Sequence, residues 1–234
     1  MRPASLLDLI DSSRENSAVV KSNGVRVGDV FRDLEAGEPW DGLSRRFALS
    51  PSELIAAFAF ETLGPADRPR LALVTGRSVP PKWSRLLSES AFAKLLPHLS
   101  ATARLALSAG MLQAVDLWDE SHEAAQNAED RGETFVSAYW HGIAHRREPD
   151  AGNATYWFRK VGSHPVFKPL AEAIERVIES DPMPAGKLLT QGTWNPFAFI
   201  QLTTHASPAF EMVAKRIQRA EIDLLLAASI AGRD

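Results

Sequence analysis

The chain has 234 residues, of which 45% are hydrophobic, and its 26 basic and 29 acidic side chains give a formal net charge of −3. This composition predicts a folded globular protein and excludes a collagen-like or disordered chain. The near balance of charge argues against a general electrostatic attraction to nucleic acid or to an anionic membrane. Because cysteine is absent, any metal site must use His, Asp or Glu.

The first fifteen residues, MRPASLLDLIDSSRE, contain too short an apolar stretch and too many acids for a secretory signal. No run of eighteen apolar residues occurs in the chain. We therefore expect a cytoplasmic protein without a membrane-spanning segment.

The N-terminal part contains a strong helix start at Ser50-Pro51-Ser52-Glu53. Ser is a preferred N-cap, Pro suits the first helical position, and Glu three residues after the cap can accept a bond from the cap amide. The helix that follows, ELIAAFAFETL, is apolar on most of its surface, so we expect it to be buried in a core or a dimer interface.

A Pro-rich segment separates this part from the rest of the chain. Residues 64–82, GPADRPRLALVTGRSVPPK, contain four prolines around one strand-like run, LALV. Apart from this run and residues 19–27, VVKSNGVRV, strand patterns are missing. We place a domain boundary near residue 70.

Residues 24–63 resemble a family of short bacterial antitoxin-like helix-turn-helix domains of unknown function. The resemblance depends on Gly24, Arg26, Val27, Ala36, Gly37, Leu49, Ser50, Ala56 and Ala57. It implies a small helical module that binds DNA or pairs with a partner protein. Residues 26–61 hold four arginines but seven acids, and the third helix offers almost no donors for base edges. These features favour a packing or dimerisation unit, and a DNA-binding regulator stays an alternative.

Helical periodicity recurs after this boundary at about 84–96, 101–117, 119–130, 134–147, 151–162, 166–180 and 208–230. Short turns between these helices predict antiparallel hairpins. The segment TWNPFAFI predicts a turn and a short buried helix, and the last helix predicts the closing wall of the bundle, with a homodimer contact as the alternative. The expected fold is all-α: a small three-helix module in residues 1–70 and a larger bundle of helical hairpins in residues 71–234.

Residues 137–162, SAYWHGIAHRREPDAGNATYWFRKVG, are the chemically densest part of the chain. They hold four of its eight Trp and Tyr residues, two histidines four positions apart and four cationic side chains. Together with WDESHEAAQ upstream and SHPVF downstream, this segment resembles a family of uncharacterised bacterial proteins over residues 105–170. The resemblance implies one folded unit and no particular activity.

Three histidines in this region are candidate metal ligands. His141 and His145 lie one helical turn apart, on the flank of the apolar stripe. An antiparallel pairing with the preceding helix brings His122 toward them, and three imidazoles suit Zn or Fe. Gly142 stands where an HExxH site has its catalytic glutamate, so we favour a polar network of histidines bonded to carbonyls or carboxylates over a metal site.

The same region also provides candidate ligand-binding residues. Arginine side chains suit a phosphate or carboxylate, although they also pair with nearby acids such as Glu148 and Asp150. We expect His141 and Arg146 to be half-buried and bonded within residues 118–162. The full candidate set is His141, His145, Arg146, Asn153, Tyr156, Trp157 and Arg159.

The leading functional interpretation is a non-enzymatic binding protein that holds a protein partner or a small anionic ligand at residues 118–162. The first alternative is a metal-dependent enzyme that uses His122, His141 and His145. The second alternative is DNA binding through residues 24–63. No signature of a nucleotide-binding protein or of a serine hydrolase occurs in the sequence.

Overall fold

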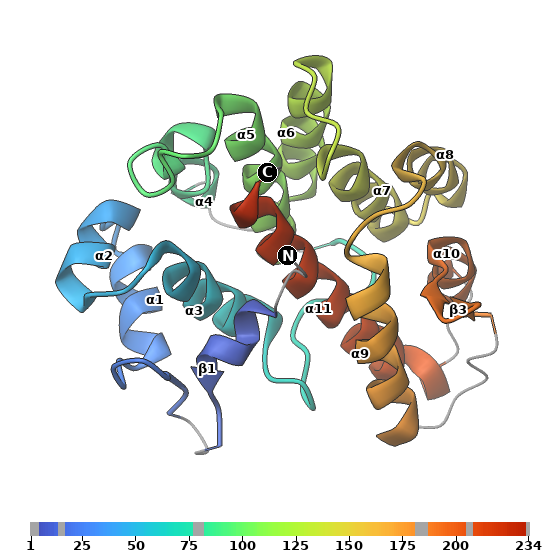
Figure 1. Ribbon diagram of the computed structural model, residues 1–234, viewed down its shortest axis with the longest axis horizontal. Helices are drawn as coiled ribbons and strands as arrows, with labels where there is room; N and C mark the ends of the chain where they lie inside the picture. The colour runs from blue at the N-terminus through green and yellow to red at the C-terminus, as the bar shows by residue number, and fades with distance from the viewer. Residues whose placement is uncertain (1–4, 14–16, 77–81, 181–186, 205–207, 233–234) are drawn as a thin grey trace.

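The computed structural model describes residues 5–13, 17–76, 82–180, 187–204 and 208–232. Within these residues it contains eleven α-helices, two short 3-10 helices and two antiparallel pairs of two-residue strands (Figure 1). The predicted all-α fold is therefore confirmed. Among the described helices, none has both the length and the apolar character needed to cross a bilayer.

The N-terminal part forms one small strand pair and three helices. A 3-10 helix, η1 (Leu6–Leu9), leads into β1 (Ile10–Asp11), which pairs with β2 (Val19–Val20) so that Ile10 lies opposite Val20. The helices are α1 (Val27–Glu35), α2 (Trp40–Phe47) and α3 (Pro51–Leu63).

The start of α3 is the predicted one. The Ser50 hydroxyl accepts from the Glu53 amide at 3.3 Å, and the Glu53 carboxylate accepts from the Ser50 amide at 2.7 Å. Every residue from Leu54 to Phe60 is buried, as the apolar sequence predicts. Because α3 would have to be the base-reading helix, its burial argues against DNA binding through this module.

A helix expected at 84–96 is replaced by a short α4 (Lys82–Leu86) and a 3-10 helix, η2 (Glu89–Phe92). The expectation was wrong because two carbonyls at the break bond to side chains elsewhere: that of Leu86 accepts from Trp40 Nε1 at 2.8 Å, and that of Leu87 accepts from the Ser108 hydroxyl. Trp40 also packs against Phe92, with ring centroids 5.5 Å apart. The core thus includes residues from both sides of residue 70, and the two-domain division stays a prediction.

The strand expected at Leu71–Val74 is also absent, since these residues have irregular backbone. The Ala72 carbonyl accepts from Gln218 Nε2 at 3.0 Å and from the Arg147 guanidinium at 3.3 Å, and the Thr75 amide donates to the Arg147 carbonyl at 2.9 Å. Groups on two helices therefore form hydrogen bonds with the backbone of this segment, where a neighbouring strand would otherwise do so.

Four consecutive helices form the predicted antiparallel hairpins along the top of Figure 1. They are α5 (Ala101–Ala114), α6 (Trp118–Asp130), α7 (Ser137–Arg147) and α8 (Ala151–Val161). All eleven residues of α7 are buried, so this helix lies between two layers, as expected. Close approach requires glycine: a Cβ at Gly110 would collide with the Trp140 ring, and one at Gly142 would lie 2.9 Å from Phe158.

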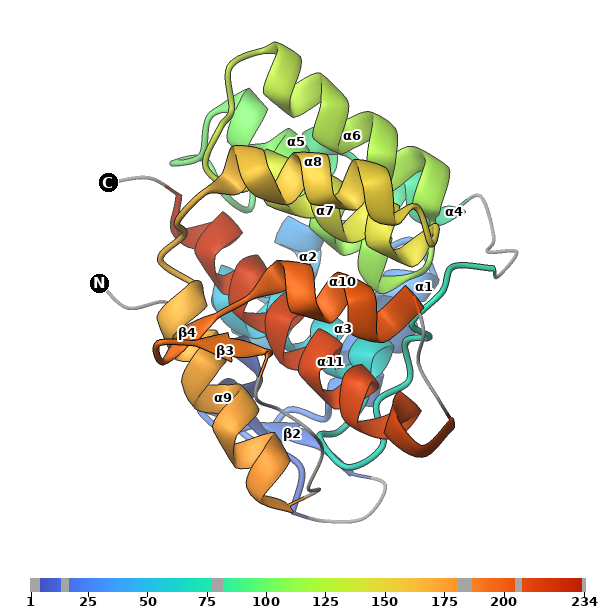
Figure 2. The same ribbon diagram turned by 90° about the vertical axis from the view of Figure 1, so that its right-hand side faces the viewer.

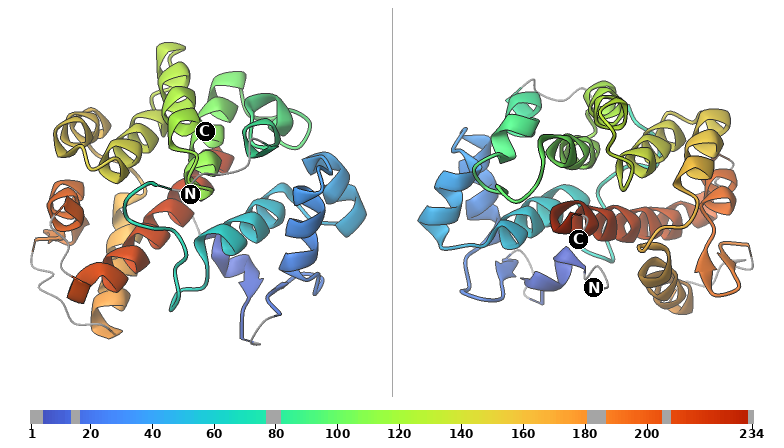
Figure 3. Two further views of the ribbon diagram at one scale, coloured as in Figure 1. Left: turned by 180° about the vertical axis from the view of Figure 1, so that it is seen from behind. Right: turned by 45° about the horizontal axis from the view of Figure 1, so that its top comes forward.

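The remaining elements are α9 (Phe167–Ser180), the hairpin of β3 (Leu189–Thr190) and β4 (Thr193–Trp194), α10 (Pro196–Thr204) and α11 (Pro208–Ala231). The turn and short helix predicted for TWNPFAFI are β4 and α10. We expected α11 to be the closing wall of the bundle, but it passes through the middle of the molecule (Figures 2 and 3). It contacts α3, α5, α9, α10 and η1, because Glu221–Leu226 are buried around the whole helix.

Candidate functional site

Three histidines from two antiparallel helices come together. His122 lies on α6, whereas His141 and His145 lie one turn apart on α7. One ring nitrogen of each lies within 4.8 Å of those of the other two, and the Nε2 atoms of His122 and His141 are 2.9 Å apart. The approach predicted from the helical spacing is therefore confirmed. We call these three residues the histidine cluster.

Two tryptophans hold the cluster between their rings. Trp157 of α8 stacks on His141, with ring centroids 3.7 Å apart and planes inclined by 16°. Trp118 stacks on His122 at 5.0 Å, and its Nε1 donates to the Ala144 carbonyl at 2.8 Å. These stacking contacts orient the planes of both imidazoles.

Burial keeps two of the imidazoles neutral. Desolvation, together with the neighbouring His122, His145 and Lys160, lowers the pKa of His141 to about 3. Burial also lowers the pKa of His122. Only one of two neutral imidazoles can donate in the contact between their Nε2 atoms. Nδ1 of His141 is buried as well, and it has no hydrogen-bond partner in the described part of the chain.

The third imidazole is oriented by a carboxylate. Nδ1 of His145 lies 2.9 Å from Oε2 of Glu148, to which it donates because an ionised carboxylate only accepts. This bond leaves Nε2 of His145 without a proton in the neutral ring. The same pairing of a carboxylate with a ligating histidine is common around protein metal ions, where it fixes the tautomer and raises ligand basicity.

Two nitrogens of the histidine cluster lie near the spacing that a zinc ion requires, and no separation among its three ligand atoms exceeds 4.8 Å. Two nitrogens bound to one tetrahedral zinc lie about 3.3 Å apart when each zinc to nitrogen bond is about 2.0–2.1 Å. The 2.9 Å between His122 and His141 would have to open by a few tenths of an ångström. His122 is only half-buried, so its ring can move outward by that amount.

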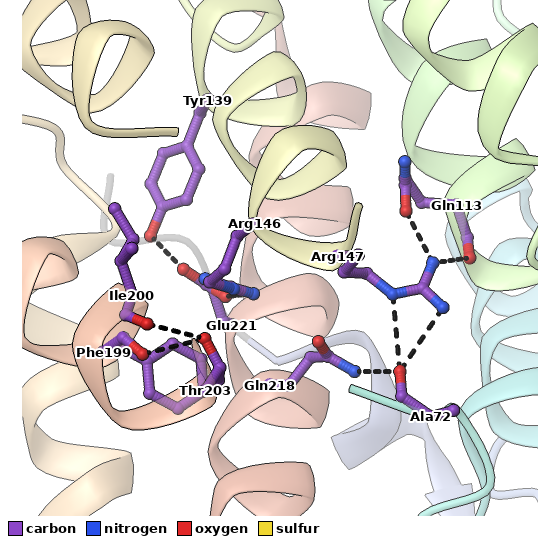
Figure 4. Close-up of polar contacts among 10 residues, drawn as sticks. All are labelled: Ala72, Gln113, Tyr139, Arg146, Arg147, Phe199, Ile200, Thr203, Gln218 and Glu221. Atoms are coloured by element: carbon purple, nitrogen blue, oxygen red, sulfur yellow. Dashed lines mark hydrogen bonds and ion pairs between the residues drawn. The ribbon is translucent and has the colours of Figure 1, made fainter. Parts of the chain in front are cut away.

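Both arginines at the end of α7 are buried, and Figure 4 shows Arg146 beside Glu221 and Arg147 beside Gln113. Arg146 pairs with Glu221 of α11 at 2.6 Å, and Tyr139 donates to the same carboxylate at 3.0 Å. Arg147 pairs with Asp116 at 2.5 Å and donates to the side chain of Gln113 at 2.6 Å. The expectation that Arg146 is bonded within residues 118–162 was wrong, because its guanidinium forms an ion pair with a buried acid on a helix distant in sequence.

The other predicted ligand-binding residues are dispersed. Asn153 belongs to the start of α8, where its amide and side chain donate to Asp150 at 2.9 and 2.8 Å. Tyr156 is 54% exposed, and Arg159 is exposed as well. Of the seven candidates, only His141, His145 and Trp157 meet.

Two residues of the site were missing from the predicted set. Trp118 precedes His122 by four residues and so shares its helical stripe, and Glu148 follows His145 by three. Both spacings place the side chain one turn from a histidine, so the sequence contained the signal.

No family model, curated protein or solved structure matches the chain. The two family resemblances therefore stay predictions.

Proposed function

We propose that this protein binds a divalent transition-metal ion, zinc or ferrous iron, at His122, His141 and His145. The observation that supports this most directly is that one nitrogen of each ring lies within 4.8 Å of the other two. Imidazole is a good ligand for both metals, and a chain without cysteine offers no thiolate ligand.

The protonation state of the cluster supports the same proposal. A metal binds only the unprotonated nitrogen, so a histidine that is charged at neutral pH must first lose a proton. The pKa of His141, about 3, and the lowered pKa of His122 mean that neither ring holds a second proton near pH 7. Both rings are already neutral in the folded protein, so metal binding does not have to remove a second proton from either of them.

Three protein ligands leave one tetrahedral position open. Catalytic zinc sites keep such a position for water or substrate, whereas structural sites fill all four with protein atoms. The half-buried edge of His122 gives the open position a route to solvent. A small anion or a metal-bound water suits the fourth position. An anion bound there would combine the two interpretations of the sequence, a site for a small anionic ligand and a metal site.

Metal content and thermal stability test the proposal. Protein purified without chelator should carry about one zinc or iron per chain by elemental analysis. At a free metal concentration of about 100 times the dissociation constant, binding adds about 2.7 kcal/mol, so EDTA should lower the melting temperature by roughly 5–10 °C. His145→Gln should abolish both effects, and a folded circular dichroism spectrum should accompany the loss.

A matched control is available within the chain. His98 is exposed, and its Nε2 contacts the Ile230 carbonyl at 3.1 Å, outside the histidine cluster. His98→Gln should keep full metal content. A substoichiometric metal content together with a melting temperature that EDTA does not change would contradict the proposal, and would favour a polar network of histidines without an ion.

A further inference from the structure

A second candidate site lies in the N-terminal part, away from the histidine cluster. A cavity of about 690 Å³ opens between the β1 and β2 segment, the start of α1, the end of α3 and the loop that follows α3. The labels of β1, α1 and α3 lie in the left half of Figure 1. Ligand-binding pockets typically have volumes of about 300–1,000 Å³. The cavity is therefore large enough for a small organic molecule.

The lining of this cavity is strongly basic for a chain of net charge −3. Four arginines line it, from Arg26 and Arg32 on the α1 side to Arg68 and Arg70 in the loop after α3. Among the described residues, two carboxylates, those of Asp29 and Glu61, share the lining with them, and Asp67 pairs with Arg68 at 3.5 Å. Counted over the described residues, the lining thus carries two more positive charges than negative ones, in a protein that is acidic as a whole.

The two carboxylates bond three of the four guanidinium groups, those of Arg26, Arg32 and Arg70, without using all of their donors. Within the described residues, Asp29 bonds Nε of Arg26 at 2.8 Å with one oxygen and Nη2 of Arg32 with the other. Glu61 accepts from Nη1 of Arg70 at 2.9 Å. A guanidinium has five N–H donors, so each arginine keeps further donors for an anion. Both Arg26 and Arg32 side chains are 67% exposed, which keeps those donors accessible.

We infer that this cavity binds a small organic phosphate with two or more negative charges. The planar fork of arginine matches the oxygen spacing of a phosphate and can bond it through two parallel N–H groups. Ser12, Ser13 and Ser17 add three hydroxyls to the lining, and Phe60 adds one aromatic residue. Hydroxyls suit the remaining phosphate oxygens, and the ring suits the organic part of the ligand.

The shape and the charge distribution favour a small molecule over a nucleic-acid backbone. Nucleic acid is held by basic residues that extend along a surface. The neighbouring arginines on α2, Arg45 and Arg46, lie outside the cavity and pair with Asp41 and Asp33 at 2.9 and 3.0 Å. The unbalanced positive charge is therefore gathered around the cavity and does not continue along α2.

Calorimetric titration with inorganic pyrophosphate at about 0.15 M salt tests the inference. We expect saturable binding that weakens at least tenfold in the double variant Arg26→Ala/Arg32→Ala. The matched control is Arg45→Ala/Arg46→Ala, which removes the same charge and the same kind of ion pair in the same module. Binding by this control should stay within twofold of the unsubstituted protein.

A second variant closes the cavity without changing its charge. A Cβ at Gly28 would meet only the Glu61 carboxylate, at 3.8 Å, so Gly28→Leu can extend into the space without a backbone clash. Leucine is also a better helix former than glycine, so α1 should be kept. We expect this variant to lose pyrophosphate binding as well.

Three results would overturn the inference. The first is the absence of saturable pyrophosphate binding, and the second is an equal loss in both double arginine variants, which would show general electrostatics. The third is a duplex DNA that binds more tightly than pyrophosphate and depends on the same two arginines, which would assign the cavity to a nucleic-acid backbone.

Discussion

Replacing Arg146 by methionine should be among the most damaging single changes in the chain. The Arg146 and Glu221 side chains are 1% and 0% exposed, and the guanidinium also lies over the Phe199 ring at 4.5 Å from its centroid. Methionine fills much of the same volume but leaves the Glu221 carboxylate with only Tyr139 as a described partner. Removing one partner of a buried ion pair typically costs about 3–5 kcal/mol, because the other charge stays buried.

Urea denaturation followed by circular dichroism measures this loss directly. The control is Arg45→Met, which breaks an ion pair whose arginine is 73% exposed and should cost less than about 1 kcal/mol. Arg146→Met/Glu221→Leu removes both charges, so it should be more stable than Arg146→Met alone. The reasoning is refuted if Arg146→Met costs no more than Arg45→Met. It is also refuted if the loss of stability in Arg146→Met/Glu221→Leu equals the sum of the losses in the two single variants, Arg146→Met and Glu221→Leu.

Two further changes test other parts of the core. Burial raises the pKa of Asp223 from 3.8 to about 6, so the folded chain binds this proton more tightly than the unfolded one, and stability should fall by about 2 kcal/mol as the pH rises from 4 to 6.5. Urea denaturation at pH 4 and pH 7 should show this fall relative to Asp223→Asn, and equal pH dependence in the two proteins would contradict it. Gly110→Ala should cost about 1–3 kcal/mol through its collision with Trp140, whereas Gly152→Ala, which would meet only the Asp150 carboxylate at 3.3 Å, should be neutral or stabilising by up to about 1 kcal/mol. Melting temperatures of the two alanine variants would decide this, and equal losses would show that the Trp140 contact is not the cause.

Features that depend on neighbours in the sequence could be predicted. Ser50, Pro51 and Glu53 lie within one helical turn, so their residue types alone define the start of α3. The meeting of His122 with His141 was predictable for a similar reason, because α6 and α7 are consecutive helices joined by a short turn. Helical spacing then determines which faces meet.

Features that depend on distant partners could not be predicted. Glu221 lies 75 residues from Arg146, and nothing within the 118–162 segment indicates that Arg146 forms an ion pair with an acid on α11. The run Leu71–Val74 has the residue types of a strand, yet the Ala72 carbonyl bonds to Arg147 and Gln218. Tertiary contacts decided both outcomes against the local pattern.

The central position of α11 has a consequence for how the chain is made. It is the last described helix in chain order, yet its Asp223 accepts from the Ser5 hydroxyl at 2.6 Å across 218 residues. Contacts of such long sequence separation form late in folding. During synthesis from the N-terminus, the apolar faces of α3, α5 and α9 therefore leave the ribosome before the helix that covers them, and the core closes only after residues 208–231 have emerged.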